Sequence, residues 1–231
     1  MTPLVLIPGM MCDARLFMPQ IAAFSHGRAV LLAPIHNDDN VAGLAQAILA
    51  TAPPRFALAG LSMGGIVAME ILRQAPERVD RIALLDTNPL AEQDDIKARR
   101  LPQMQAVQNG RLRDVMRDEM KPNYLAPGPN RAGVLDMCMT MALDLGPHAF
   151  LRQSRALMDR RDQTDTLRNA QLPALILCGQ HDTLCPVARH QLMADLMPNA
   201  HLEIIKNAGH LPTLEQPGAT NTALGRWLGI S

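Results

Sequence analysis

A serine in the sequence GLSMGG, residues 60–65, has the surroundings of a nucleophile. Ser62 follows the apolar run 56–59 and precedes the apolar segment 66–72, which together predict a strand, a tight turn and a helix. The glycines at 60 and 64 suit such a turn, because a Cβ atom two residues to either side of the serine would collide with the neighbouring strand and helix. The helix start also supplies free N–H groups, including that of Met63, for an oxyanion. The pattern predicts a serine that attacks a carbonyl carbon.

A serine hydroxyl is a weak nucleophile and needs a histidine as base, with an acid to orient that histidine. Asp182 follows the buried strand expected at 173–178, and His210 follows the strand expected at 201–205. The chain order serine, acid, histidine is the one that accompanies this type of turn. Functional residues of parallel sheets gather at the carboxyl ends of the strands, so we expect the three side chains to meet there.

Asp86 is a second candidate acid, because it ends the strand expected at 80–86. It would either assist His210 or replace Asp182. The interpretation that we favour is a capping or loop hydrogen bond, because Asp182 already fits the expected order.

The elements that position these residues alternate between strands and helices. Aliphatic runs without polar alternation predict strands buried on both faces, near residues 3–7, 28–33, 55–60, 80–86, 173–178 and 201–205. Helical patterns lie between them, at 41–51, 63–75, 187–197 and 218–228. This rhythm predicts an α/β fold with a mostly parallel, doubly wound sheet of about six strands.

A long interruption separates the fourth and fifth expected strands. About 80 residues are too many for an ordinary connection, so they must form structure of their own. Their pattern is helical, with breaks expected at Pro102, 121–123, 127–129 and 146–147. We therefore expect a core of residues 1–88 and 171–231 and a helical insertion of residues 89–170.

Composition agrees with a compact enzyme. The 231 residues are 48% hydrophobic and carry no net charge, which disfavours nucleic acid and an anionic membrane surface. No apolar run is long enough to span a bilayer, and residues 3–7 lack the features of a leader, so a cytoplasmic location is expected. Four scattered cysteines predict neither disulfides nor a metal site.

Four segments in order carry a resemblance to the α/β-hydrolase family, from end to end of the chain. They are LIPGMM at 6–11, GLSMGG at 60–65, GQHDTLCP at 179–186 and NAGHLP at 207–212. The resemblance implies Ser62 as nucleophile, His210 as general base and Asp182 as its orienting acid. It also implies an oxyanion hole from the N–H groups of Met10 and Met63, with Met11 the alternative to Met10. The 89–170 insertion then corresponds to a cap over the site.

The resemblance implies a carboxylic ester hydrolase, a serine esterase or lactonase, that needs no cofactor. The subfamilies most similar are carboxylesterases, enol-lactonases and carrier-protein methyl ester esterases. Three alternatives stay open: an acyltransferase, a cofactor-free haloperoxidase or C–C hydrolase, and a receptor that binds a ligand without turnover. The substrate is expected to be a small, partly apolar ester.

Side chains of the insertion are the candidates for substrate contact. The methionines Met137 and Met141, together with Met11, are expected to line an acyl pocket, because methionine adapts to varied apolar ligands. Packing of the cap against the core is the alternative. Many arginines of the insertion alternate with acids, which favours a solvated face over a site for an anionic substrate group or an acidic acyl-carrier protein.

Overall fold

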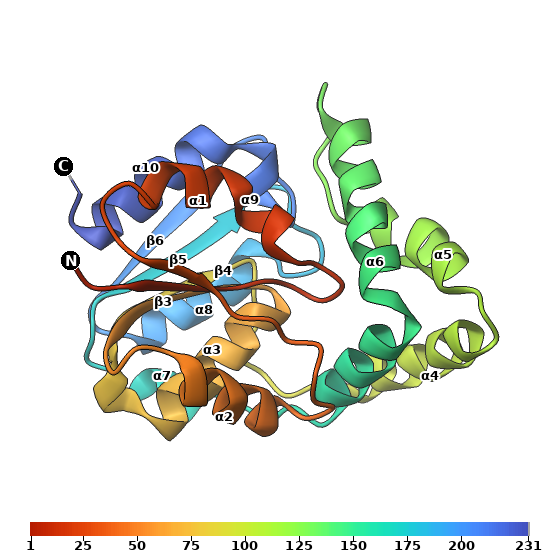
Figure 1. Ribbon diagram of the computed structural model, residues 1–231, viewed down its shortest axis with the longest axis horizontal. Coiled ribbons are helices and arrows are strands. Elements are labelled where there is room, and N and C mark those ends of the chain that lie inside the picture. Colours follow the sequence, from red (N-terminus) through yellow and green to blue (C-terminus); the bar gives the residue numbers. More distant parts are fainter. Residues whose placement is uncertain (231) are drawn as a thin grey trace.

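Six parallel strands form one sheet at the centre of the molecule. The computed structural model describes residues 1–230. The strands lie in the order β2, β1, β3, β4, β5, β6 (Figure 1). Their bounds are β1 Leu4–Ile7, β2 Val30–Leu32, β3 Phe56–Leu61, β4 Val79–Leu85, β5 Ala174–Gly179 and β6 Ala200–Ile205, and all pairs are parallel. This confirms the predicted doubly wound sheet. The order changes direction at β1, and the carboxyl ends of β1 and β3 flank the place where ligands of such sheets bind.

Alternate side chains of each strand belong to two apolar cores. Val5 and Ile7 of β1 pack into one core, whereas Leu4 and Leu6 pack into the other. Figure 1 shows α1 (Met18–Phe24), α9 (Pro212–Glu215) and α10 (Pro217–Leu228) on one face of the sheet. The other face carries α2 (Val41–Thr51), α3 (Met63–Gln74), α7 (Thr164–Arg168) and α8 (Val187–Leu196). Burial on both faces is why the strands are continuous apolar runs.

A third group of helices lies beside the sheet, on the right in Figure 1. It consists of α4 (Asp94–Gln108), α5 (Leu112–Val115) and α6 (Arg131–Met158). A short turn joins α4 to α5, whereas residues 116–130, which include a π-helical segment at Met116–Met120 and a 3-10 turn at Lys121–Asn123, lead from α5 to α6. The 89–170 segment also contains α7, which packs against α3 and α8. The division into core and cap at these boundaries stays a prediction. Within residues 1–230, no helix is long and apolar enough to cross a membrane.

One expected break in the insertion is a kink, and another is absent. Gly146 has φ 78° inside α6, so the helix changes direction immediately before Pro147. The break expected at Pro102 was wrong, because α4 continues through it. Pro102 is exposed, so solvent reaches the helix face where the missing N–H frees a carbonyl group.

Candidate active site

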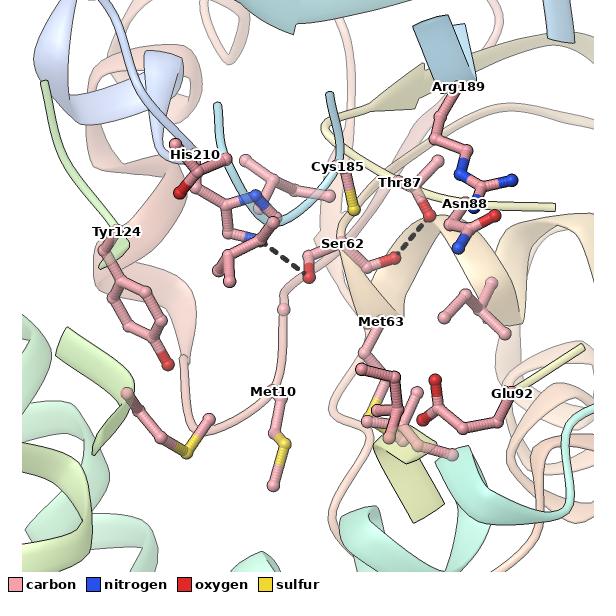
Figure 2. A pocket seen from close by; sticks show the side chains of 18 of the residues that line it. Met10, Ser62, Met63, Thr87, Asn88, Glu92, Tyr124, Cys185, Arg189 and His210 are labelled. Atoms are coloured by element: carbon pink, nitrogen blue, oxygen red, sulfur yellow. Dashed lines mark hydrogen bonds between the residues drawn. The ribbon is translucent and has the colours of Figure 1, made fainter. Parts of the chain in front are cut away.

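Ser62 lies in a strained turn between β3 and α3. Its φ of 55° and ψ of −118° are sparsely populated by residues with a side chain. A Cβ atom on Gly60 would collide with the backbone of Gly64, and one on Gly64 would collide with the backbone of Ile7. The Thr87 hydroxyl donates to the Ser62 carbonyl oxygen at 2.7 Å and helps to hold the turn. The close packing leaves the Ser62 side chain directed into a pocket (Figure 2).

A chain of hydrogen bonds joins the three residues expected from the sequence. His210 Nε2 lies 2.9 Å from Ser62 Oγ, and His210 Nδ1 lies 2.8 Å from Asp182 Oδ2. An ionised carboxylate has no proton to give, so Nδ1–H donates to Asp182 and Nε2 accepts from the serine hydroxyl. Figure 2 shows the His210 ring aimed at Ser62. This is the arrangement of a nucleophile, a base and an orienting acid.

The surroundings of Asp182 favour its ionised form. Burial by itself raises the pKa of this carboxyl, but the charge of His210 and hydrogen bonds together bring the pKa below its usual value. Those hydrogen bonds come from His210 and from the N–H groups of Leu184 and Cys185, at 2.8 and 3.0 Å. Asp182 therefore meets His210 as an anion.

The loop that carries His210 is fastened to its neighbours by one carboxylate. Glu215 accepts hydrogen bonds from the N–H groups of Gly209, Leu211 and Ala126. The N–H of His210 also donates to the Tyr124 carbonyl oxygen at 2.6 Å. Since Tyr124 and Ala126 precede α6, the histidine loop and the insertion support each other.

Asp86 lies beside Asp182 instead of beside His210. Its Oδ1 accepts from the Gly179 N–H at 2.8 Å, and its Oδ2 is buried without a donor among the described residues. Burial and the nearby negative charge of Asp182 raise the pKa of Asp86 well above its usual value. These surroundings favour a protonated, neutral Asp86 beside the ionised Asp182.

The turns at the ends of β1 and β3 present the expected oxyanion donors. Within residues 1–230, the N–H groups of Met10 and Met63 have no hydrogen-bond partner, so both are free to bind an oxyanion. The N–H of Met11 is already occupied, because it donates to Gln153 Oε1 at 2.9 Å. Between the two alternatives in this loop, the geometry therefore favours Met10.

A cavity of about 430 Å³ opens in front of Ser62 and His210. Its walls come from the sheet edge, from α8 and from the insertion. The insertion contributes the side chains Glu92, Gln93, Ile96, Arg100, Met120, Tyr124, Leu157 and Arg160. The helices beside the sheet thus form one side of the pocket.

Met11, Met137 and Met141 do not line this cavity. Met11 and Met141 are buried in the apolar cores, and the Met141 sulfur accepts from the Asp13 N–H at 3.4 Å. Met137 is on the exposed surface of α6. The sequence predicted correctly that the methionine cluster lies on a helix. It did not show which side of that helix faces the pocket. Met10, Met63 and Met120 are the methionines that line it.

Polar residues of the pocket include several that the sequence did not single out for this place, namely Asn88, Glu92, Arg100, Arg160 and Arg189. Their signal in the sequence is weak, because none of them lies in the four segments that carry the family resemblance. All four cysteines are free. Among the described residues, one group has metal-ligand spacing, Asp182, Cys185 and His210, and two of its members already bond to each other.

The sequence and the structure of this chain are both similar to those of known proteins. The model of a family described as "Alpha/beta hydrolase family" matches residues 4–223. The "Uncharacterized carboxylesterase nap" of Bacillus subtilis is 26% identical, over 97% of this chain and 78% of its own length. The "Biotin biosynthesis bifunctional protein BioHC" of Teredinibacter turnerae is 26% identical over 76% of this chain, and the match spans only 33% of that protein. A thermophilic esterase from Thermogutta terrifontis, solved with malate bound, has a TM-score of 0.89 and 25% identity, covering 99% of this chain and 90% of its own.

Proposed function

The chain belongs to the alpha/beta hydrolase family, and from that premise we propose that it is a serine esterase or lactonase acting on a small carboxylic ester. Relatives named as esterases support a hydrolase activity. The observation that carries the proposal is the continuous hydrogen-bond chain from Ser62 through His210 to Asp182, which ends in the pocket.

The geometry supports a reaction in two halves. In the first, the Ser62 oxygen bonds to the ester carbonyl carbon while its proton passes to His210 Nε2. The carbonyl oxygen becomes an anion, and the free N–H groups of Met10 and Met63 stabilise it. The C–O bond to the alcohol then breaks, and the alcohol leaves with the proton from His210.

In the second half, water replaces the alcohol. His210 removes a proton from the water as its oxygen attacks the acyl carbon, and the Ser62 oxygen leaves with that proton. Asp182 holds the imidazole in one orientation and stabilises its positive form throughout. The products are a carboxylic acid, an alcohol and the free enzyme.

The pocket sets the size of the ester. A volume of about 430 Å³ lies at the small end of the range for ligand pockets, about 300–1,000 Å³. Apolar side chains such as Ile66, Met120 and Leu157 line part of it. A small ester with an apolar portion therefore fits better than a long acyl chain.

Replacement of Ser62 tests the proposal directly. Ser62→Ala should abolish the hydrolysis of short aryl and methyl esters, with only roughly 10³- to 10⁴-fold catalysis over water remaining. Ser25→Ala is the matched control, because Ser25 is exposed and does not line the pocket. This variant should hydrolyse the same esters at the parent rate. A fluorophosphonate should modify the parent protein once, on Ser62.

A folded Ser62→Ala protein that keeps a tenth of the parent activity would contradict the proposal. Circular dichroism confirms the fold of each variant. Added methanol as a competing acceptor separates hydrolysis from acyl transfer, because a transferase would form the methyl ester in preference to the acid.

A further inference from the structure

The pocket beside Ser62 has an excess of positive charge. Arg100, Arg160 and Arg189 line it, and Glu92 is the only carboxylate among the described residues of its wall. Figure 2 draws Arg189, Asn88 and Glu92 on the side of the pocket opposite His210. The polar side of the cavity thus faces the reacting group across the space that a substrate occupies.

Glu92 is shared by two of the three arginines. Its Oε2 lies 2.7 Å from Arg100 Nη2, and its Oε1 lies 3.1 Å from Arg160 Nη2. The side chains of Glu92 and Arg160 are only 4% and 8% exposed. One buried carboxylate cannot balance two guanidinium groups, so this cluster alone carries a positive charge.

Arg189 adds a charge without any counterion. Among residues 1–230, its guanidinium makes no hydrogen bond or ion pair, although it is half-buried at the pocket. Arg189 also lies in the first turn of α8, Val187–Leu196, where the helix dipole is positive. A cation there is unfavourable in the free protein, and a bound anion removes that cost.

Asn88 provides a further donor on the same side. Its Oδ1 accepts from the Leu90 N–H at 3.1 Å, and this leaves the side-chain NH₂ group free to donate. A planar guanidinium and an amide NH₂ match the two oxygens of a carboxylate, because each oxygen can accept a charge-assisted hydrogen bond. A neutral group in this place would leave the donors unpaired.

We propose that the pocket binds an ester that carries a second, ionised carboxylate, held by Arg189 and Asn88 beside the Arg100–Glu92–Arg160 cluster. The inference rests on the proposed esterase function and names its substrate class. The monoesters of short dicarboxylic acids are the simplest members of this class.

Pairs of esters that differ in charge alone test the proposal. The monomethyl esters of succinic, glutaric and adipic acid are compared with the methyl esters of the corresponding half-amides, which have the same shape and no charge. The ratio of kcat/KM for the charged and neutral members of the best pair should exceed one by roughly 10- to 100-fold, as expected for hydrogen bonds to a charged group. Added salt should lower the ratio.

Arg189→Gln should reduce this ratio by the same factor, chiefly through KM of the charged ester. Arg189→Lys should restore part of it, since the charge returns without the planar fork. Arg155→Gln is the matched control, because Arg155 is exposed on α6 and does not line the pocket. An equal fall in the ratio with Arg155→Gln would show a long-range effect and overturn the proposal, as would a parent ratio near one.

A binding measurement separates this proposal from the esterase function. Adipate, glutarate and succinate are titrated by calorimetry into the Ser62→Ala protein and into the Ser62→Ala, Arg189→Gln protein, with adipamide as the neutral control. Binding of a dicarboxylate that weakens at least roughly tenfold in the second protein supports the carboxylate site even if no ester is hydrolysed. Hydrolysis of both ester types with no dicarboxylate binding would refute the carboxylate site and leave the esterase function standing.

Discussion

Two buried carboxyl groups lie behind His210, and their neighbours give them different charges. Asp182 receives hydrogen bonds from His210 and from two backbone N–H groups, which lower its pKa against the effect of burial. Asp86 receives one, from Gly179, and burial raises its pKa. Like charges in contact cannot both ionise, so the pair carries one negative charge, on Asp182. These charges support Asp182 as the orienting acid of the proposed mechanism, with Asp86 as its neutral neighbour.

Amide substitutions at the two positions should have unequal effects. Asp182→Asn should lower kcat by about 10⁴-fold, because the amide supports the wrong imidazole tautomer. Asp86→Asn should lower it far less, since a neutral amide replaces a neutral acid of nearly the same shape. Steady-state kinetics on one aryl ester measures both. A silent Asp182→Asn beside a crippled Asp86→Asn would reverse the assignment.

At the scale of single residues, the sequence predicted those positions that depend only on the ends of strands and on chain order. Ser62, Asp182 and His210 each follow a strand end, so strand positions and chain order sufficed to place them together. The lining residues Arg189 and Asn88 escaped prediction, because a single arginine among many gives no sign of lacking a partner. Met137 and Met141 were misplaced, because spacing along a helix does not show which side meets the cavity.

The helix α6 contacts the loop that contains Met10, the proposed oxyanion donor. Gln153, 1% exposed, accepts from the Met11 N–H at 2.9 Å and donates to the Ile35 carbonyl oxygen at 3.0 Å. Met11 has φ 56°, a conformation that needs support from its surroundings. One side chain therefore fixes the backbone next to the Met10 N–H. No sequence pattern predicts this contact, because its partners are more than a hundred residues apart along the chain.

Replacing Gln153 should affect both stability and turnover. Gln153→Met leaves the N–H of Met11 and the carbonyl of Ile35 buried without partners, which costs about 1–3 kcal/mol of unfolding free energy for each group. The loosened Met10 donor should lower kcat by up to roughly 10²-fold, with a smaller change in KM. Urea unfolding and ester kinetics measure the two effects.

Gln105→Met, at an exposed position of α4, is the control for the substitution itself. A variant of Gln153 that is less stable but has the parent kcat would show that Gln153 supports the fold alone.

The strands and outer helices could be predicted, because their apolar periodicity is local. The path of α4 through Pro102 could not, because it depends on which face solvent reaches.

On the scale of the whole molecule, a buried histidine couples folding to pH. His190 on α8 accepts from the Thr87 N–H at 3.1 Å, and its other ring nitrogen contacts the Pro186 carbonyl oxygen at 3.3 Å. Burial lowers the pKa of His190 to about 4, although the contact with Pro186 opposes the shift. The folded protein therefore keeps His190 neutral at pH values where the unfolded chain binds a proton.

Stability should consequently fall on acidification. With an unfolded pKa of about 6.5, the contribution of His190 is complete above that pH and is lost as the pH falls toward 4, by up to about 3 kcal/mol. His190→Gln should flatten the dependence of the unfolding free energy between pH 7 and pH 5, measured by urea denaturation. Parallel pH profiles for parent and variant would contradict this account. The sequence showed only a histidine in a helix, since its burial depends on the packing of α8 against the sheet.

The insertion begins and ends at neighbouring strands. It leaves the sheet after β4 and returns before β5, and these two strands pair directly, with Ile82 opposite Ala174. The separation of its two ends is thus fixed by the sheet, whatever lies between them. Closing a longer loop costs only about 0.6 kcal/mol for each doubling of its length. Descendants of such a chain can therefore exchange or lengthen this segment and acquire new substrates, while the inherited turn with its serine is left untouched.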